Sequence, residues 1–184
     1  MPAEKQTGIA LLRGINVGGR HLLPMKSLVS LMESVGFENI RTYIQSGNVV
    51  FDHSGTVSEE SIESVRGLVE EHHGFSPEIL VLTLEQFRRA IQGNPYPEAV
   101  DDPKSLHLSF LSEEASRADL EGMEALKSPT EHFQLTGRVF YLHAPDGIGR
   151  SKLAAKVEPL LGVPATGRNW RTVMKLADLA GLGG

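Results

Sequence analysis

Apolar residues recur along this chain with two different periods, and the changes between the periods mark the expected strands and helices. An unbroken apolar run at residues 9–12 is typical of a buried strand. Leu28, Leu31 and Val35 instead recur at helical spacing, shortly after Pro24. For the first half, these patterns predict strand 9–12, helix 24–35, strand 40–45, strand 49–51, a helix capped by Ser58 and stopped by Gly74, and strand 78–82.

The second half repeats this succession of patterns after a connector that is rich in proline and glycine. The connector, residues 84–103, begins with a short helix at 84–91. A closing helix ends the chain, and Asn169 is a suitable N-cap for it. Between them, the periods predict strand 106–111, helix 113–126, strand 133–135, strand 139–143, helix 152–161 and strand 163–166.

Each half therefore has the order strand, helix, strand, strand, helix, strand, which is the order of the ferredoxin-like fold. We expect an α+β protein with two tandem ferredoxin-like units, residues 1–83 and 104–168. The connector, 84–103, lies between them, and a C-terminal helix, 169–184, is expected to pack on the body. The repeat lies in the pattern alone, because the halves show no residue-level identity.

The first expected strand ends in a glycine-rich loop, Arg13-Gly14-Ile15-Asn16-Val17-Gly18-Gly19-Arg20. Loops held at strand ends by a rigid sheet commonly carry binding groups. The glycine spacing is that of a phosphate-binding P-loop, but that motif needs a lysine and a Ser or Thr where this chain has Arg20 and His21. Backbone N–H groups in such a turn can bind an anion without the motif. The alternative is a tight connection from strand to helix, with an arginine that only solvates the rim.

Polar residues gather at one edge of the first expected sheet for topological reasons. In the ferredoxin-like order, the end of the first strand, the turn between the second and third strands, and the start of the first helix share that edge. The candidate ligand-binding residues there are Arg13, Gly14, Asn16, Gly18, Gly19, Gln45, Ser46 and Asn48, with Arg168 and Asn169 joining them if the packing of the two halves allows it.

These residue types suit recognition of an anion better than bond cleavage. We expect Arg13 to contact a small anionic ligand, such as a nucleotide, and the glycine N–H groups to cradle it. Gln45 and Asn48 would read the polar edge of that ligand. The alternative is that these two amides satisfy only backbone groups around tight turns.

Composition narrows the class of protein. The net charge of −5 argues against a general nucleic-acid binder, although the chain from Arg138 onward has seven basic and only three acidic residues. The chain has no cysteine, which excludes disulfides and thiolate metal sites and fits a reducing compartment. No apolar run approaches 18 residues, and Met1–Thr7 lacks the apolar region of a secretory signal. We therefore expect a cytoplasmic protein without a membrane span.

The catalytic motifs that such a chain could carry are incomplete. Its seven histidines are scattered, His72 and His73 point in different directions on one helix, and no HExxH spacing exists, so we expect no metal site. The G-x-S-x-G elbow of a serine hydrolase is absent. The sequence indicates neither a catalytic residue nor a particular cofactor or oligomeric state.

Three stretches of the chain resemble a bacterial family known as domain of unknown function 1697. They are Ile9–Gly19, then Tyr43–Phe51, then Arg168-Asn169-Trp170 with Thr172-Val173 and Lys175-Leu176. They bracket nearly the whole chain in the right order. The resemblance implies two tandem ferredoxin-like units, but no established activity and no catalytic residues. Arg20 is one departure, because the family more often has lysine there, and the charge is kept.

Two other classes of function compete with ligand binding. An RNA-recognition module stacks bases on aromatic residues of its central strands. Candidates for that role are Tyr43, Phe51, Phe110 and Tyr141, although Asp52 stands where such a strand would carry a cation. The third class is a protein-interaction module that uses the connector or the closing helix. The leading hypothesis is a small-molecule-binding protein with its ligand at the polar edge.

Overall fold

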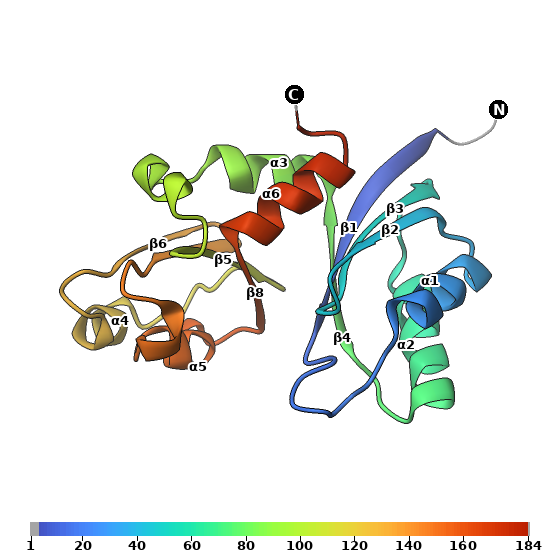
Figure 1. Cartoon of the computed structure of the whole chain (residues 1–184), viewed down its shortest axis with the longest axis horizontal. Helices are drawn as coiled ribbons and strands as arrows, with labels where there is room; N and C mark the ends of the chain where they lie inside the picture. Colours follow the sequence, from blue (N-terminus) through green and yellow to red (C-terminus); the bar gives the residue numbers. More distant parts are fainter. Residues whose placement is uncertain (1–3, 184) are drawn as a thin grey trace. The chain divides into compact units, whose positions relative to one another are not determined.

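The computed structural model describes residues 4–183, which form two compact units. Residues 1–3 of the Met1–Thr7 segment, and the last residue of the expected C-terminal helix, lie outside the described part. One unit consists of the chain up to Arg89 together with the chain from Lys175 onward, and the other is Ala90–Met174. Each contains a four-stranded antiparallel sheet with helices, so the predicted α+β class is confirmed (Figure 1). The expected segments 1–83, 84–103, 104–168 and 169–184 stay a prediction about which parts fold independently.

The first unit builds its sheet in the order β2-β3-β1-β4, with every neighbouring pair antiparallel. Figure 1 shows α1 and α2 on one face of this sheet. Its elements are β1 (Lys5–Arg13), α1 (Met25–Ser34), β2 (Glu38–Tyr43), β3 (Asn48–Ser54), α2 (Glu59–His73) and β4 (Glu78–Thr83), after which α3 (Leu84–Gln92) continues into the second unit.

Local signals account for most of these boundaries. As predicted, Ser58 caps α2 by accepting a hydrogen bond from the N–H of Ser61, and Gly74 ends the helix with a left-handed φ of 80°. Pro24 is the extended N-cap of α1 and not its first helical residue. The second strand ends two residues earlier than predicted, because Ile44 has a φ of 50° that no strand can continue.

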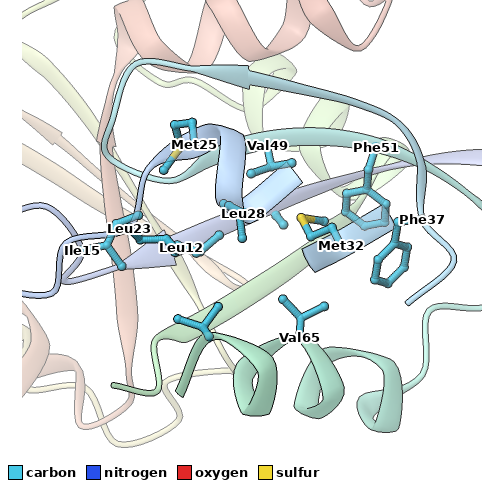
Figure 2. Close-up of a cluster of buried hydrophobic side chains, with 12 residues drawn as sticks. Leu12, Ile15, Leu23, Met25, Leu28, Met32, Phe37, Val49, Phe51 and Val65 are labelled. Carbon is cyan, nitrogen blue, oxygen red and sulfur yellow. The ribbon is translucent and has the colours of Figure 1, made fainter. Parts of the chain in front are cut away.

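The core of the first unit lies between its sheet and the helices α1 and α2 (Figure 2). Leu12, Leu28 and Val65 are almost completely buried there, and burial of each such side chain contributes about 1.5–3 kcal/mol. The ring of Phe51 covers Gly8 so closely that a Cβ atom on Gly8 would lie 2.7 Å from it. A glycine is therefore needed in the central strand to let the ring pack.

The second unit has the same order of elements and an equivalent strand order, β6-β7-β5-β8, again antiparallel throughout. Figure 1 shows α4 and α5 on one face of that sheet. Its elements are η1 (Pro97–Asp101), β5 (Leu106–Leu111), α4 (Leu120–Leu126), β6 (His132–Thr136), β7 (Val139–His143), η2 (Ile148–Arg150), η3 (Ala154–Lys156), α5 (Val157–Leu161) and β8 (Ala165–Asn169), followed by α6 (Trp170–Leu179), which ends in the first unit.

The helices of the second unit are shorter than predicted. The helix expected at 113–126 begins only at Leu120, because the side chain of Asp119 caps it by accepting from the N–H of Gly122. The helix expected at 152–161 is split into the 3-10 turn η3 and the five-residue α5, because Lys156, the last residue of η3 and the N-cap of α5, has a non-helical φ of −121°. Both helices depart from prediction because local capping and backbone breaks overrode the weak apolar period.

The last strand of the second unit also differs from the prediction. It was expected at 163–166, but β8 runs on to Asn169, which places Arg168 and Asn169 in the sheet and not in a loop. Asn169 still caps α6 as predicted, because its Oδ1 accepts a hydrogen bond of 2.9 Å from the N–H of Thr172. None of the helices between residues 4 and 183 is long and apolar enough to cross a membrane.

Candidate functional site

The turn between β2 and β3 lies directly on the end of β1, as the expected strand order requires. The N–H of Leu12 donates to the carbonyl of Gly47 over 2.8 Å. Gly47 is buried with a φ of 82°, and a Cβ atom there would lie 2.5 Å from the Cβ of Leu12. Only glycine permits both this backbone conformation and this close approach.

Asn16 joins three segments of the first unit through one side-chain amide. Its Nδ2 donates to the carbonyls of Leu23 (2.9 Å) and Gln45 (2.6 Å), and its Oδ1 accepts from the N–H of Leu23 (2.8 Å). Leu23 immediately precedes the N-cap of α1, and Gln45 belongs to the β2–β3 turn. The glycine-rich loop, the turn and the start of α1 are therefore fixed together, which agrees with the predicted convergence.

The tip of the glycine-rich loop is a two-residue turn. The N–H of Arg20 donates to the carbonyl of Val17 over 3.0 Å, and the two glycines between them have φ values of 57° (Gly18) and 73° (Gly19). Two successive positive φ angles define the type I′ turn, which strongly favours glycine. The turn therefore explains the presence of glycine at positions 18 and 19 without any ligand.

The base of the same loop is closed by His21. Its ring Nδ1 lies 2.9 Å from the carbonyl oxygen of Gly14, and its ring stacks on Phe75 with centroids 4.7 Å apart. Gly14, Asn16 and His21 all have positive φ angles. Such a concentration of left-handed residues is uncommon and is typical of loops shaped for a function.

The two amides of the β2–β3 turn have different surroundings. Asn48 is fully buried, and its Nδ2 donates to the carbonyl of Tyr43 (3.0 Å) and to the hydroxyl of Ser46 (2.9 Å). Gln45 is exposed, and its side chain makes none of the hydrogen bonds recorded among residues 4–183. For Asn48, the structural alternative is supported, because its amide hydrogens already hold the turn.

A basic residue and a helix N-terminus lie at this edge. Arg13 is the last residue of β1, where it is half-buried and directly opposite Glu78 of β4. The N-terminus of α1 has neither a side-chain cap nor an acidic residue in its first turn. The partial positive charge of that helix end is thus left without a local acidic side chain, which favours an anion nearby.

Three aliphatic side chains of the loop and turn are exposed to solvent. Val17 is 66% exposed, Leu22 62% and Ile44 52%. Ile44 is also unusual because a β-branched residue is strained at its φ of 50°. An exposed aliphatic residue in a strained turn is an uncommon combination, and it lies beside the exposed Gln45 in the chain.

Arg168 and Asn169 lie in the second unit, where both line a cavity of about 350 Å³. The guanidinium of Arg168 donates to the carbonyl of Gly167 over 2.9 Å, and burial lowers the pKa of Arg168 to about 10. The cavity also contains His107 and Ser109, which sequence reasoning missed. Their signal was the alternation Leu106-His107-Leu108-Ser109-Phe110, whose polar residues resemble an ordinary solvent-facing side.

Within the described part of the chain, no three His, Cys, Asp or Glu side chains are grouped as metal ligands would be. Phe51, Phe110 and Tyr141, three of the four aromatic candidates for base stacking, are at most 2% exposed. Phe51 belongs to the core of its unit, and the hydroxyl of Tyr141 donates to the carbonyl of Ala90 over 2.7 Å. This placement argues against stacking of RNA bases on these residues.

The fold and the site define an α+β protein with two units of equal strand order and a polar edge built around Asn16. The sequence model of the family described as "Protein of unknown function (DUF1697)" matches residues 6–141. The chain therefore belongs to the DUF1697 family, as the first two of its three matching stretches predict. The third stretch, from Arg168 to Leu176, lies beyond the matched residues. No curated protein matches the chain.

A solved structure resembles the chain in fold. The conserved bacterial protein SP0830 from Streptococcus pneumoniae is 22% identical, and the match covers 96% of this chain and 99% of that one with a TM-score of 0.71. A structure described as a proposed glycine cleavage system transcriptional repressor is 13% identical over 90% of this chain and 97% of that one. Its TM-score of 0.23 is too low to support any inference.

Proposed function

We propose that the protein binds a small anionic molecule, such as a nucleotide, at the polar edge of its first unit. The observation that carries the proposal is the Asn16 amide, which holds the glycine-rich loop, the β2–β3 turn and the start of α1 together. A preformed set of N–H groups, a guanidinium and a helix N-terminus is the usual equipment of an anion site. We also infer that both units are ferredoxin-like, because their element order and strand order are those of that fold.

The proposed roles follow from what each side chain already does. Arg13 contacts the anion, the N–H groups of Gly14, Gly18 and Gly19 lie around it, and Gln45 reads its polar edge. Asn16, Ser46 and Asn48 are positioning residues, since their polar groups hold backbone or one another. Arg168 and Asn169, which the sequence adds only if the packing of the two halves allows it, line the cavity of the second unit. A cytoplasmic location is also part of it, in keeping with the absence of cysteine.

A thermal-shift screen tests the proposal directly. Inorganic phosphate, AMP, a sugar phosphate and a short RNA are added separately, because a specific ligand raises the melting temperature by mass action. We expect AMP or the sugar phosphate to stabilise the protein. A shift with RNA alone that salt abolishes would support the RNA alternative instead, and a flat screen would contradict ligand binding.

Variants then locate the site. Arg13→Ala is expected to weaken binding at least about tenfold, because a charge-assisted hydrogen bond is lost. Gln45→Ala is the milder test, since that side chain is exposed and its removal leaves the turn intact. Arg117→Ala and Gln92→Ala, both exposed, serve as matched controls. Equal effects of site and control variants would refute the proposed location.

A protein-interaction role is the second candidate, and the exposed aliphatic residues of the loop and turn favour it. Val17, Leu22 and Ile44 expose more than half of their surface each, and exposed apolar groups at a shaped loop are typical of contact surfaces. A flat ligand screen, together with self-association that Val17→Ser and Leu22→Ser abolish in sedimentation experiments, would favour this function. Sedimentation as a monomer before and after the substitutions would count against self-association.

A further inference from the structure

The cavity of the second unit has a floor made by three neighbouring strands. The strand register places Phe140, Ser109 and Gly167 directly opposite one another, and Leu142, His107 and Asn169 form the next row. Residues in one row of an antiparallel sheet point to the same face. Ile148, Ala154 and Val157 line the cavity from the segments that follow β7. A polar strip therefore crosses a cavity whose other walls are largely apolar.

His107 lines this cavity, and its protonation state decides which ring nitrogen can accept a hydrogen bond. Its Nε2 lies 2.9 Å from the carbonyl oxygen of Lys104, and a carbonyl can only accept, so Nε2 carries the proton. Burial lowers the pKa of His107, which keeps the ring neutral at physiological pH. The second ring nitrogen, Nδ1, is then an acceptor.

Ser109 and Asn169 supply the complementary groups. The Ser109 hydroxyl, which can donate and accept, has no hydrogen bond to any residue between 4 and 183. The Oδ1 of Asn169 is occupied by the N–H of Thr172, so the polar group that remains is its Nδ2 donor. Glu158 and Arg168 also line the cavity, and their opposite charges give it no net preference for an ion.

At the equivalent place, the sheet of the first unit has apolar residues. The register pairs Ala10 with Val81 there, where the second unit has Ser109 and Gly167. Gly167 creates the space, because a Cβ atom on it would meet only the Ser109 hydroxyl, at 3.4 Å. A few convergent polar groups in a concave, mostly apolar site are typical of ligand recognition.

We propose that this cavity binds a small uncharged planar heterocycle with N–H and C=O groups side by side, as in a nucleobase or another cyclic amide. The N–H donates to Nδ1 of His107, the carbonyl accepts from Asn169 or Ser109, and the ring faces contact Phe140, Leu142 and Val157. A cavity of about 350 Å³ is at the small end of ligand sites and fits a single ring system. This inference involves the second unit and does not depend on anion binding at the polar edge.

The test is a titration of the ¹⁵N-labelled full chain, followed by two-dimensional NMR. Uracil and hypoxanthine are the probes, and 1,3-dimethyluracil is the matched control, because it keeps the ring shape but has no N–H donor. We expect uracil or hypoxanthine to shift the amide signals of Ser109 and Gly167, and dimethyluracil to bind at least about tenfold more weakly. No shift with either probe, or equal binding of dimethyluracil, would overturn the proposal.

Two variants localise the binding. Gly167→Val places a branched side chain on the cavity floor against the Ser109 hydroxyl and is expected to abolish binding. Ser109→Ala, which changes volume little, is expected to weaken it several-fold, whereas Ser112→Ala, at an exposed position directly after β5, is not. If Gly167→Val fails to fold by circular dichroism, Ser109→Ala decides. Binding that survives both substitutions would place the probe elsewhere and refute the site.

Discussion

The second helix of the first unit, α2, has 15 residues, whereas its counterpart in the second unit, α5, has five. The long helix is capped by Ser58 and buries Val65 and Val69 against its sheet. The short one has no side-chain cap, and the sheet beneath it retains polar residues. The order of elements thus sets the same sheet twice, and each unit has a cavity of about 350 Å³ beside its second helix. The strand residues that line it are the apolar Ile79 and Val81 in the first unit, whereas they include polar residues in the second.

The hairpin turns of the two units also differ, and here the first unit has the longer turn. In both units the turn carbonyl accepts from the N–H of the leucine near the end of the first strand: Gly47 from Leu12 (2.8 Å) and Arg138 from Leu111 (2.9 Å). The β2–β3 turn has four residues between its strands, and the β6–β7 turn has two. The two extra residues bring Gln45 to Asn16, so the elaborate edge belongs to the first unit.

The largest expected difference between the units is the loss of stability when the glycine of each hairpin turn, Gly47 or Gly137, is replaced. Gly47→Ala puts a Cβ atom 2.5 Å from that of Leu12, so we expect a loss of at least about 3 kcal/mol in the free energy of unfolding. Gly137 has a φ of 56° but open space around it, so Gly137→Ala should cost only about 1 kcal/mol. Urea unfolding measures both, and equal losses would show that the close packing of the first turn is unimportant.

An intermediate effect concerns Asp52, which accepts hydrogen bonds from Thr7 (3.0 Å), Asn39 (2.8 Å) and Arg41 (3.2 Å). Burial alone would raise the pKa of Asp52, but these hydrogen bonds and the charge of Arg41 outweigh it and lower the pKa. A lowered pKa in the folded state stabilises the protein above about pH 4, and this stabilisation is lost as the pH falls further.

Replacement of that carboxylate should therefore flatten the acid dependence of stability. Asp52→Asn is expected to cost about 1–2 kcal/mol at pH 7 and to reduce the slope of stability between about pH 5 and pH 2. Asp101→Asn, in an exposed position of the second unit, is the control and should leave that slope unchanged. Unfolding measured across this pH range gives the answer, and an unchanged slope in Asp52→Asn would contradict the assignment.

The smallest effect is a gain in stability at the strained turn. Ile44→Asn replaces a β-branched residue with one that tolerates a φ of 50°, so we expect about 0.5–1 kcal/mol of stabilisation. Leu22→Asn is the control, because Leu22 is similarly exposed but is absent from the residues with positive φ. A destabilised Ile44→Asn protein would mean that the isoleucine side chain makes a contact worth more than the strain.

The fold was largely predictable because its strands have strong local signals. The apolar run 9–12 and the Ser58 cap with the Gly74 stop each identified an element by themselves. The start of α4 was not predictable, because nothing in 113–118 distinguishes a charged loop from a charged helical turn until Asp119 caps the helix. The end of β8 was missed because Gly167 interrupts the strand pattern.

The polar edge could be predicted from the sequence, whereas the cavity of the second unit could not. The polar edge follows from strand order, so Asn16 and Gln45 could be brought together from the sequence alone. The cavity depends on which side chains three strands direct to one face and on a missing side chain at Gly167. Whether a glycine leaves a cavity depends on its neighbours in space, which the sequence does not show. A half-buried histidine in an alternating strand is also common and does not by itself indicate a site.

The most direct measurement of anion binding at the first unit is an NMR titration of the full chain with AMP and with inorganic phosphate. We expect the amide signals of Gly18, Gly19 and Gln45 to shift and saturate together, while that of Gly137, in the two-residue β6–β7 turn of the second unit, stays in place. Unmoved signals in the glycine-rich loop, or equal shifts at Gly137, would contradict anion binding at the first unit.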